Sequence, residues 1–278
     1  LQILQMLNQL DVRKLGLHTA DYLHTLIELK KIVYEDRARF YADPKFVKLD
    51  MKRLLSEAYA KERLKLFDPL KASKRIPHGD RILEHGDTVY LTVVDKDRNA
   101  ISLIQSNYYG FGSGNVPDDL GFCIQDRGTL FSLESGHPNV FEPGKRPFHT
   151  IIPAFVTKNG KPVFSFGVMG GSMQPQGHVQ VLLNIIDFKL NIQEAGDLPR
   201  FRHGGSSQPH FGRMSDGGAV SLEMGIPFHV RRDLTGRGHL LIQANGGFGG
   251  YQGIWIDWDR GILIGASETR KDGCAIGY

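Results

Sequence analysis

The hydrophobic pattern of this sequence changes its period near residue 88, and that change constrains the fold more than any other feature. Before residue 68 the apolar side chains recur at steps of three and four, the spacing of one helix face; from Thr88 they alternate every second residue, as in strands. Glycine follows the same division, because 32 of the 33 glycines come after residue 78. We therefore expect a helical first part and a mostly β second part.

Two helices are expected in the first part. Residues 19–42 form one, with Thr19 as N-cap and Asp43-Pro44 as its end, and residues 50–67 form another whose Lys and Arg side chains make the solvated face. Residues 69–87 lack periodicity and mix proline, glycine and charge, which is typical of an exposed linker.

The second part reads as strands interrupted by one good helix. Residues 88–95 and 100–106 form a hairpin across a turn at 96–99, and the helix begins near Pro175. Further strands are expected at 162–168 and 255–265, the latter broken at 259–261.

The charge distribution excludes nucleic acid as a partner. The first 78 residues carry a net charge of +6 and the remainder −2, so the pI of 9.0 comes from the helical part. A nucleic-acid binder is expected to gather basic residues on its functional face, whereas the glycine-rich part is slightly acidic.

No apolar run reaches the roughly 18 residues of a membrane span, and the opening segment has no basic region of a signal peptide. Leu1 already lies in a helical pattern, so we expect further residues upstream. The sequence is compatible with a cytoplasmic or an exported location.

Local motifs alone do not identify the chemistry. Gly110–Gly114 could cradle a phosphate, but such a loop must open a helix and Pro117 follows instead. Gly170-Gly171, between a strand and a helix, could donate backbone N–H groups to an oxyanion, although spacing alone favours a simple strand-to-helix turn.

Histidine and cysteine patterns give no stronger indication. No G-x-S-x-G turn supports a triad of Ser172 with His149 or His178, and Cys123 has no signature of a nucleophile. With two cysteines and no Cys/His set at zinc spacing, we expect neither a disulfide framework nor a metal ion or cofactor.

Six blocks of sequence carry a more specific signal. They are YEDRARFYADPKFV (34–47), GDTVYLTVVDKDRNAISLIQS (86–106), GKRPFHTIIPA (144–154), FGVMGGSMQPQGHVQ (166–180), DLPRF (197–201) and GASETRKDGCAIGY (265–278). Together, and in order over essentially the whole chain, they resemble the gamma-glutamyltransferase family of N-terminal nucleophile hydrolases. The resemblance implies an α/β fold, the four-layer α/β/β/α sandwich, of which this chain supplies a part.

The resemblance also implies a proenzyme that cuts itself between Asp87 and Thr88. Residues 1–68 then correspond to the helical end of a large subunit, 69–87 to the processing linker and 88–278 to the small catalytic subunit. The two subunits stay associated as a heterodimer from one precursor, and most of the large subunit lies upstream of Leu1.

Four site residues follow from the same resemblance. Thr88 is the nucleophile, and its freed α-amine acts as the base, since an amine with a reference pKa of about 7.7–8.0 can accept the hydroxyl proton without a histidine. Ser106 takes the place of the hydroxyl residue that hydrogen-bonds the nucleophile. Gly170 and Gly171 match the oxyanion-hole pair.

The substrate pocket departs from the family pattern. Tyr108 stands where the family has Asn, Arg127 and Leu130 replace the Gln or Glu and the Asp that bind the substrate's amino group, and His149-Thr150 replaces a Ser-Ser pair. Arg127 would repel an ammonium. Residues 132–146 also look shorter than the family's lid, which implies a more open cleft.

These changes leave two substrate hypotheses and two other classes of function. The substrate is a small-molecule amide, either γ-glutamyl as in glutathione or, as in the related cephalosporin acylases, a carboxylate-bearing acyl group such as glutaryl. The alternatives are a truncated, non-catalytic paralogue and a nucleotide binder using Gly110–Gly114.

Overall fold

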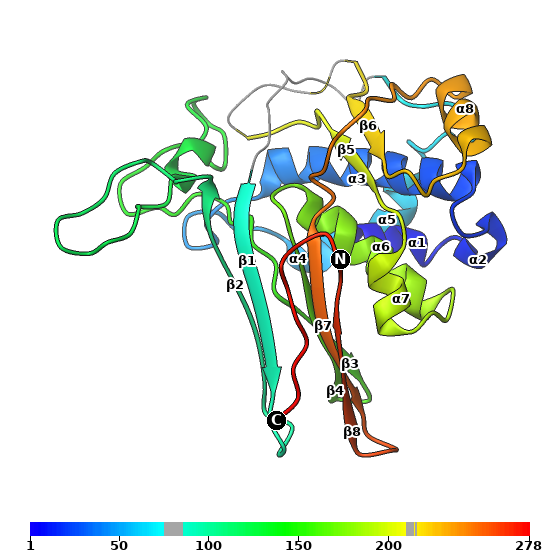
Figure 1. The fold of residues 1–278 in the computed structure, drawn as a ribbon. Coiled ribbons are helices and arrows are strands. Elements are labelled where there is room, and N and C mark those ends of the chain that lie inside the picture. The colour runs from blue at the N-terminus through cyan, green and yellow to red at the C-terminus, as the bar shows by residue number, and fades with distance from the viewer. Residues whose placement is uncertain (75–85, 210–213, 215) are drawn as a thin grey trace. The chain divides into compact units, whose positions relative to one another are not determined.

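The computed structural model of the chain describes residues 1–74, 86–209, 214 and 216–278 (Figure 1). Its contacts define two units, each assembled from three chain segments. The first unit comprises Leu1–Leu83, Arg127–His149 and Phe201–Ala244, and the second comprises Glu84–Asp126, Thr150–Arg200 and Asn245–Tyr278.

The first unit is built around one long helix, α3 (Ala20–Phe40) (Figure 1). Thr19 caps it as the sequence predicts, because its hydroxyl accepts a hydrogen bond of 3.1 Å from the Tyr22 N–H. Seventeen of its 21 residues are buried, several of them charged. The charged side chains of α3 must therefore find partners inside the unit rather than in water.

The second predicted helix is interrupted. Residues 50–67 form two short helices, α4 (Met51–Leu54) and α5 (Glu57–Leu64). The break lies at Ser56, whose hydroxyl donates to the Arg53 carbonyl oxygen and accepts from the Tyr59 N–H. One side chain thus ends the first helix and begins the second.

The other elements of the first unit are short. Helix α8 packs against α3, and β5 pairs antiparallel with β6 (Figure 1). These elements are α1 (Gln2–Leu7), α2 (Val12–Leu15), a 3-10 turn (Arg127–Leu130), β5 (Phe201–Gly204), β6 (Ala219–Leu222) and α8 (Phe228–Gly236).

The second unit contains the predicted hairpin, β1 (Gly86–Val94) with β2 (Ala100–Tyr109). The strands pair antiparallel from Val94 opposite Ala100 up to Thr88 opposite Ser106, and the register then shifts between Asp87 and Thr88. Such an irregularity bends a strand and changes the direction of its side chains.

A four-stranded antiparallel sheet in the order β3-β4-β7-β8 forms the rest of the second unit, together with two helices (Figure 1). Its core is aromatic: the rings of Phe164 and Phe166 stack at 4.6 Å and are fully buried together with Tyr251. These elements are β3 (Ala154–Lys158), β4 (Lys161–Met169), α6 (Met173–Ile186), α7 (Ile192–Asp197), β7 (Gly250–Asp257) and β8 (Ile262–Ser267).

Helix α6 begins where the sequence places it, with Pro175 in its first turn. Gly177 lets the helix approach β4 closely, because a Cβ atom there would lie 2.5 Å from a methyl carbon of Val168. Most of the predicted linker 69–87 lies outside the described residues. The division into subunit parts at 68 and 87 therefore stays a prediction.

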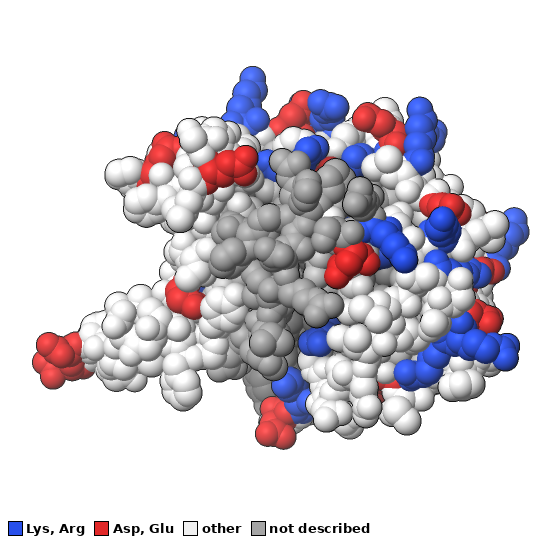
Figure 2. All heavy atoms as spheres, turned by 90° about the horizontal axis from the view of Figure 1, so that it is seen from above, with Lys and Arg blue, Asp and Glu red and all other residues white. Residues whose placement is uncertain are grey.

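Charged side chains of both signs lie on the face that Figure 2 draws. Figure 2 shows Lys and Arg side chains interspersed with Asp and Glu over the face that it draws. Within the described residues, no helix is both long and apolar enough to cross a membrane.

Candidate active site

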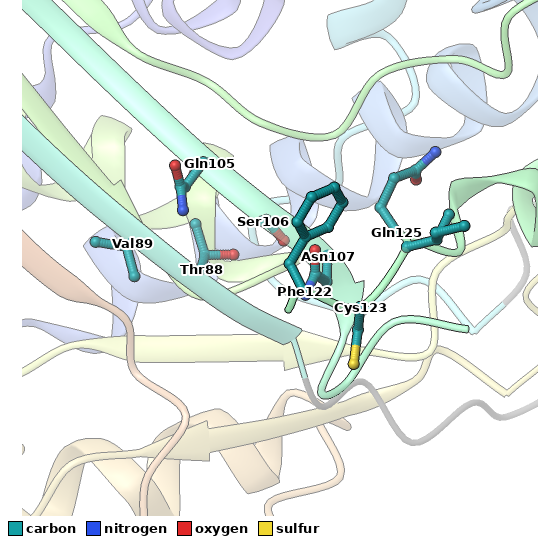
Figure 3. A pocket seen from close by; sticks show the side chains of 9 residues that line it. Thr88, Val89, Gln105, Ser106, Asn107, Phe122, Cys123 and Gln125 are labelled. Carbon is teal, nitrogen blue, oxygen red and sulfur yellow. The ribbon is translucent and has the colours of Figure 1, made fainter. Parts of the chain in front are cut away.

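An open cavity of about 540 Å³ lies beside Thr88 in the second unit (Figure 3). Its walls come from the end of the β1–β2 hairpin and from the loop that follows β2. Nine residues line it: Thr88, Val89, Gln105, Ser106, Asn107, Phe122, Cys123, Ile124 and Gln125. A cavity of this volume is within the usual range for small-molecule sites.

Thr88 is the most buried residue of this wall, with 2% of its surface exposed. It comes directly after the register shift in β1 and is paired across the hairpin with Ser106. In Figure 3 the two hydroxyl groups point toward one another. The strand irregularity therefore turns a threonine hydroxyl inward at the rim of a cavity.

The hydroxyl of Ser106 has a defined orientation. Its oxygen accepts a hydrogen bond of 2.9 Å from the Tyr108 N–H. A hydroxyl that accepts in this way still has its own proton to donate. Tyr108, in turn, has a φ of 80°, a left-handed conformation that costs a side-chain-bearing residue about 1–2 kcal/mol.

None of the nine described residues that line the cavity has an acidic, basic or histidine side chain. Gln105, Asn107 and Gln125 contribute primary amides, and the apolar remainder includes Phe122. Alternation along β2 could have indicated that Gln105 and Asn107 share a face, but nothing local in the sequence places 122–125 beside them. The sequence reasoning therefore missed these lining residues.

Gly170 and Gly171 form the turn between β4 and α6. Both have positive φ, 123° and 59°, and their carbonyl oxygens accept hydrogen bonds from the N–H groups of Met173 and Gln174. A Cβ atom on Gly170 would lie 3.0 Å from the Cα of Gly249. Conformation and space together therefore require glycine at position 170.

Side-chain contacts fix how β1 runs along β4. The hydroxyls of Thr92 and Ser165 are 2.6 Å apart, and the ring of Tyr90 covers Gly167, where a Cβ atom would lie 2.4 Å from it. The Tyr90 hydroxyl lies 2.7 Å from the Ser102 hydroxyl, and burial raises the pKa of Tyr90. From the Thr92–Ser165 contact to the Tyr90–Gly167 contact, the position moves back two residues along β1 and forward two residues along β4. The two strands therefore run in opposite directions where they touch.

The gamma-glutamyltranspeptidase family profile matches residues 1–278, the whole chain. The chain belongs to the gamma-glutamyltranspeptidase family. It is 34% identical over 278 residues to the glutathione hydrolase-like YwrD proenzyme of Bacillus subtilis, covering 99% of this chain and 50% of that protein. It is 32% identical over 275 residues to the acylase ACY 1 proenzyme of a Pseudomonas species, covering 99% and 47%.

Among solved structures, the chain resembles the cephalosporin acylase of Bacillus halodurans, with a TM-score of 0.80 and 38% identity over 100% of this chain and 50% of that one. The predicted family and the α/β fold class of N-terminal nucleophile hydrolases are therefore confirmed. The chain spans about half the length of the curated relatives it matches.

Three of the predicted pocket residues, Arg127, Leu130 and His149, lie in the first unit. Arg127 is buried in the 3-10 turn. The pKa of His149 is lowered mainly by burial and, to a smaller extent, by the positive charges of Arg127 and Arg146. Asp43 accepts hydrogen bonds from Arg146, which hold the pKa of that carboxyl below its usual value. Leu130 is fully buried and so belongs to the core.

The remaining predicted positions are distributed over the family fold. Thr150 and Tyr108 lie in the second unit, whereas Arg127 and His149 lie in the first. His178 is buried on α6, where its Nδ1 is 2.6 Å from the Gln174 carbonyl oxygen, an ordinary structural contact. In Gly110–Gly114 the chain forms turns, and no described helix opens there.

Proposed function

We propose that this chain contains the catalytic part of an autoprocessing N-terminal threonine hydrolase that transfers an acyl group from a small-molecule amide to water or an amine. The observation that carries the proposal is the position of Thr88. Its buried hydroxyl follows a strand irregularity, faces a cavity and pairs with a second hydroxyl residue. Family membership supplies the chemistry that such a threonine performs.

The contacts between β1 and β4 support Gly170 and Gly171 as the oxyanion-hole donors. Thr92 meets Ser165 and Tyr90 meets Gly167, so the next step of two residues brings Thr88 level with Met169, the residue before Gly170. Backbone N–H groups at that turn would stabilise the negative oxygen that develops when Thr88 attacks a carbonyl. Each such donor contributes about 2.7–4 kcal/mol.

Processing and turnover use the same hydroxyl. In processing, the Thr88 Oγ1 attacks the Asp87 carbonyl carbon and its proton passes to the Thr88 nitrogen as the Asp87–Thr88 C–N bond breaks, which leaves an ester and a free Thr88 amine. Water then hydrolyses the ester to the Asp87 carboxylate and the Thr88 hydroxyl. In turnover, the amine accepts the proton of Oγ1 as the oxygen attacks the substrate amide, and it then protonates the leaving amine. Water or an acceptor amine next attacks the acyl-Thr88 ester, gives up a proton to the Thr88 amine, and releases the acyl group while that proton restores the Oγ1 hydroxyl. Ser106 holds the hydroxyl in position.

We propose that Arg127, His149, Thr150 and Tyr108 bind the acyl chain and that it carries a carboxylate without an α-amino group, as in glutaryl. Arg127 presents positive charge and hydrogen-bond donors, and His149, whose pKa is lowered by burial and then by the charges of Arg127 and Arg146, presents a neutral imidazole that can hydrogen-bond. The nine residues that line the Thr88 cavity offer no acid to pair with an ammonium. A glutamyl ammonium would therefore lack an acidic partner among these nine residues.

The test compares two chromogenic amides with one leaving group, glutaryl-p-nitroanilide and γ-glutamyl-p-nitroanilide, on the full-length protein. We expect a higher kcat/KM for the glutaryl amide and a selective loss of it in Arg127→Gln. Arg232→Gln, a surface arginine of the same unit, is the control. Exclusive γ-glutamyl turnover would refute the acyl specificity, and no turnover or processing of any amide would favour the non-catalytic paralogue.

A further inference from the structure

Three side chains of types that can bind a metal ion, His24, Glu28 and His239, lie close together inside the first unit. His24 and Glu28 are four residues apart on α3 and so share one face of that helix. His239 follows α8, where its N–H bonds the Leu234 carbonyl oxygen. One ligand atom from each lies within 4.8 Å of the others, and all three residues are buried.

Each side chain is oriented by a neighbour. The His24 Nε2 is 2.8 Å from the Asp68 carbonyl oxygen and donates to it, which leaves the lone pair of Nδ1 directed at His239. The Glu28 carboxylate accepts one hydrogen bond from the Ser73 N–H and one from Lys31. A histidine that binds a metal ion usually donates its other ring N–H to a backbone carbonyl, a carboxylate or water.

Hydrogen bonds and an ion pair, without any metal ion, can also hold these three side chains together. The His24 Nδ1 and His239 Nε2 are 2.7 Å apart, the distance of one shared proton, and Lys31 is 2.7 Å from a Glu28 oxygen. Two nitrogen ligands of a tetrahedral Zn²⁺ stand about 3.3 Å apart, given bonds of about 2.05 Å. Binding therefore requires the rings to separate by roughly half an ångström and the shared proton to move to the other nitrogen of His239.

We propose that His24 Nδ1, His239 Nε2 and a Glu28 carboxylate oxygen form a binding site for a transition-metal dication of the Zn²⁺ class. Two imidazoles and a carboxylate suit Zn²⁺, Co²⁺ or Ni²⁺, whereas Mg²⁺ and Ca²⁺ require mostly oxygen ligands. The site joins α3 to the segment after α8, so its role is to hold the first unit together. This departs from the sequence expectation of no metal, which rested on local spacing.

A further property of the cluster fits an ion. Each oxygen of a carboxylate has two lone-pair positions, so Glu28 can keep its contacts with Ser73 and Lys31 while it binds. The Lys31 ammonium competes with the metal ion for the Glu28 carboxylate.

The primary experiment titrates metal-depleted protein with Co²⁺ and records the visible d–d spectrum, then displaces the Co²⁺ with Zn²⁺. We expect one equivalent to bind, with intense bands of low coordination number, and excess Mg²⁺ or Ca²⁺ to leave the spectrum unchanged. Absence of a saturable one-to-one spectrum in the wild-type protein overturns the proposal.

Two variants of His239 test the ligand assignment, with the exposed His229→Gln on α8 as the matched control. In His239→Gln we expect affinity to fall by more than the 10–100-fold that loss of an outer-shell partner costs. His239→Cys, a smaller and less polar replacement, should add a thiolate-to-cobalt charge-transfer band that His229→Cys lacks. Unchanged binding in His239→Gln, or no new band in folded, Co²⁺-saturated His239→Cys, contradicts the assignment.

Discussion

Thr88 and Ser106 stand directly opposite each other across the β1–β2 hairpin, at the last regular pair before the register shifts toward Asp87. The pairing matters because position 88 is buried and lies at the rim of a cavity. Antiparallel pairing fixes the separation of the two side chains more rigidly than a loop could. In the proposed mechanism, this rigidity holds the nucleophile in place before any substrate arrives.

Ser106→Ala removes the hydroxyl that supports Thr88. We expect processing and turnover each to slow roughly tenfold, as for the loss of about 1.4 kcal/mol of transition-state hydrogen bonding. Ser106→Thr, which keeps the hydroxyl, should retain most of both rates. Time courses of subunit formation and kcat values provide the measurement, and a fully active Ser106→Ala would remove Ser106 from the site.

Gly171→Ala tests the oxyanion hole. We expect kcat to fall about 10²–10³-fold, because the added methyl group disturbs an N–H donor at a φ of 59°. Gly160→Ala is the matched control, since Gly160 also has a positive φ, 76°, in the β3–β4 turn and no atom lies within 4 Å of its added Cβ. Equal losses of activity in the two variants would mean that backbone strain alone is responsible.

Tyr108→Asn should both stabilise the protein and change its specificity. Asparagine tolerates the left-handed conformation better than tyrosine, so the free energy of unfolding should rise by about 0.5–1 kcal/mol. Arg98→Asn, at a φ of 68° in the hairpin turn, should give a similar gain. Only Tyr108→Asn is expected to alter the ratio of γ-glutamyl to glutaryl turnover; a shift in both variants, or in neither, would argue against a substrate role for Tyr108.

Acid should destabilise the second unit through His178. Burial lowers its pKa from 6.5 to about 4, so between these two pH values the unfolded chain binds a proton that the folded chain does not. Stability is therefore lost as pH falls from about 6.5 to 4, by roughly 3 kcal/mol. Urea unfolding at pH 7 and 4.5 should show that acid lowers the free energy of unfolding less in His178→Gln than in the wild type. The exposed-residue control His229→Gln should lose as much as the wild type. Equal losses in all three proteins would contradict this origin.

Local signals in the sequence predicted the helices and strands better than they predicted the side-chain contacts between them. Thr19, Pro175 and the alternation from Thr88 mark real element boundaries because capping, fixed φ and side-chain periodicity act within a few residues. The break at Ser56 was not predicted, since a serine inside a helical pattern gives no sign that it will cap in both directions.

Burial of charge could not be predicted from α3 alone. Lys30 is buried because its ammonium reaches the His203 carbonyl oxygen and the Ser206 hydroxyl, more than 170 positions away in the chain. His24 and His239 meet for the same reason. Family motifs were sufficient to predict the candidate site residues. The strand irregularity before Thr88 and the position of the loop 122–125 could not be predicted, because they depend on tertiary contacts and not on a local sequence pattern.

Intact-mass spectrometry and an amide-hydrolysis assay of the full-length protein, wild type beside Thr88→Ala, test whether Thr88 cuts the chain and catalyses turnover. We predict two fragments from the wild type, one of them beginning at Thr88 with a free α-amine, and a single uncut, inactive chain from Thr88→Ala. An intact wild-type chain that hydrolyses amides, or an active Thr88→Ala variant, would contradict it.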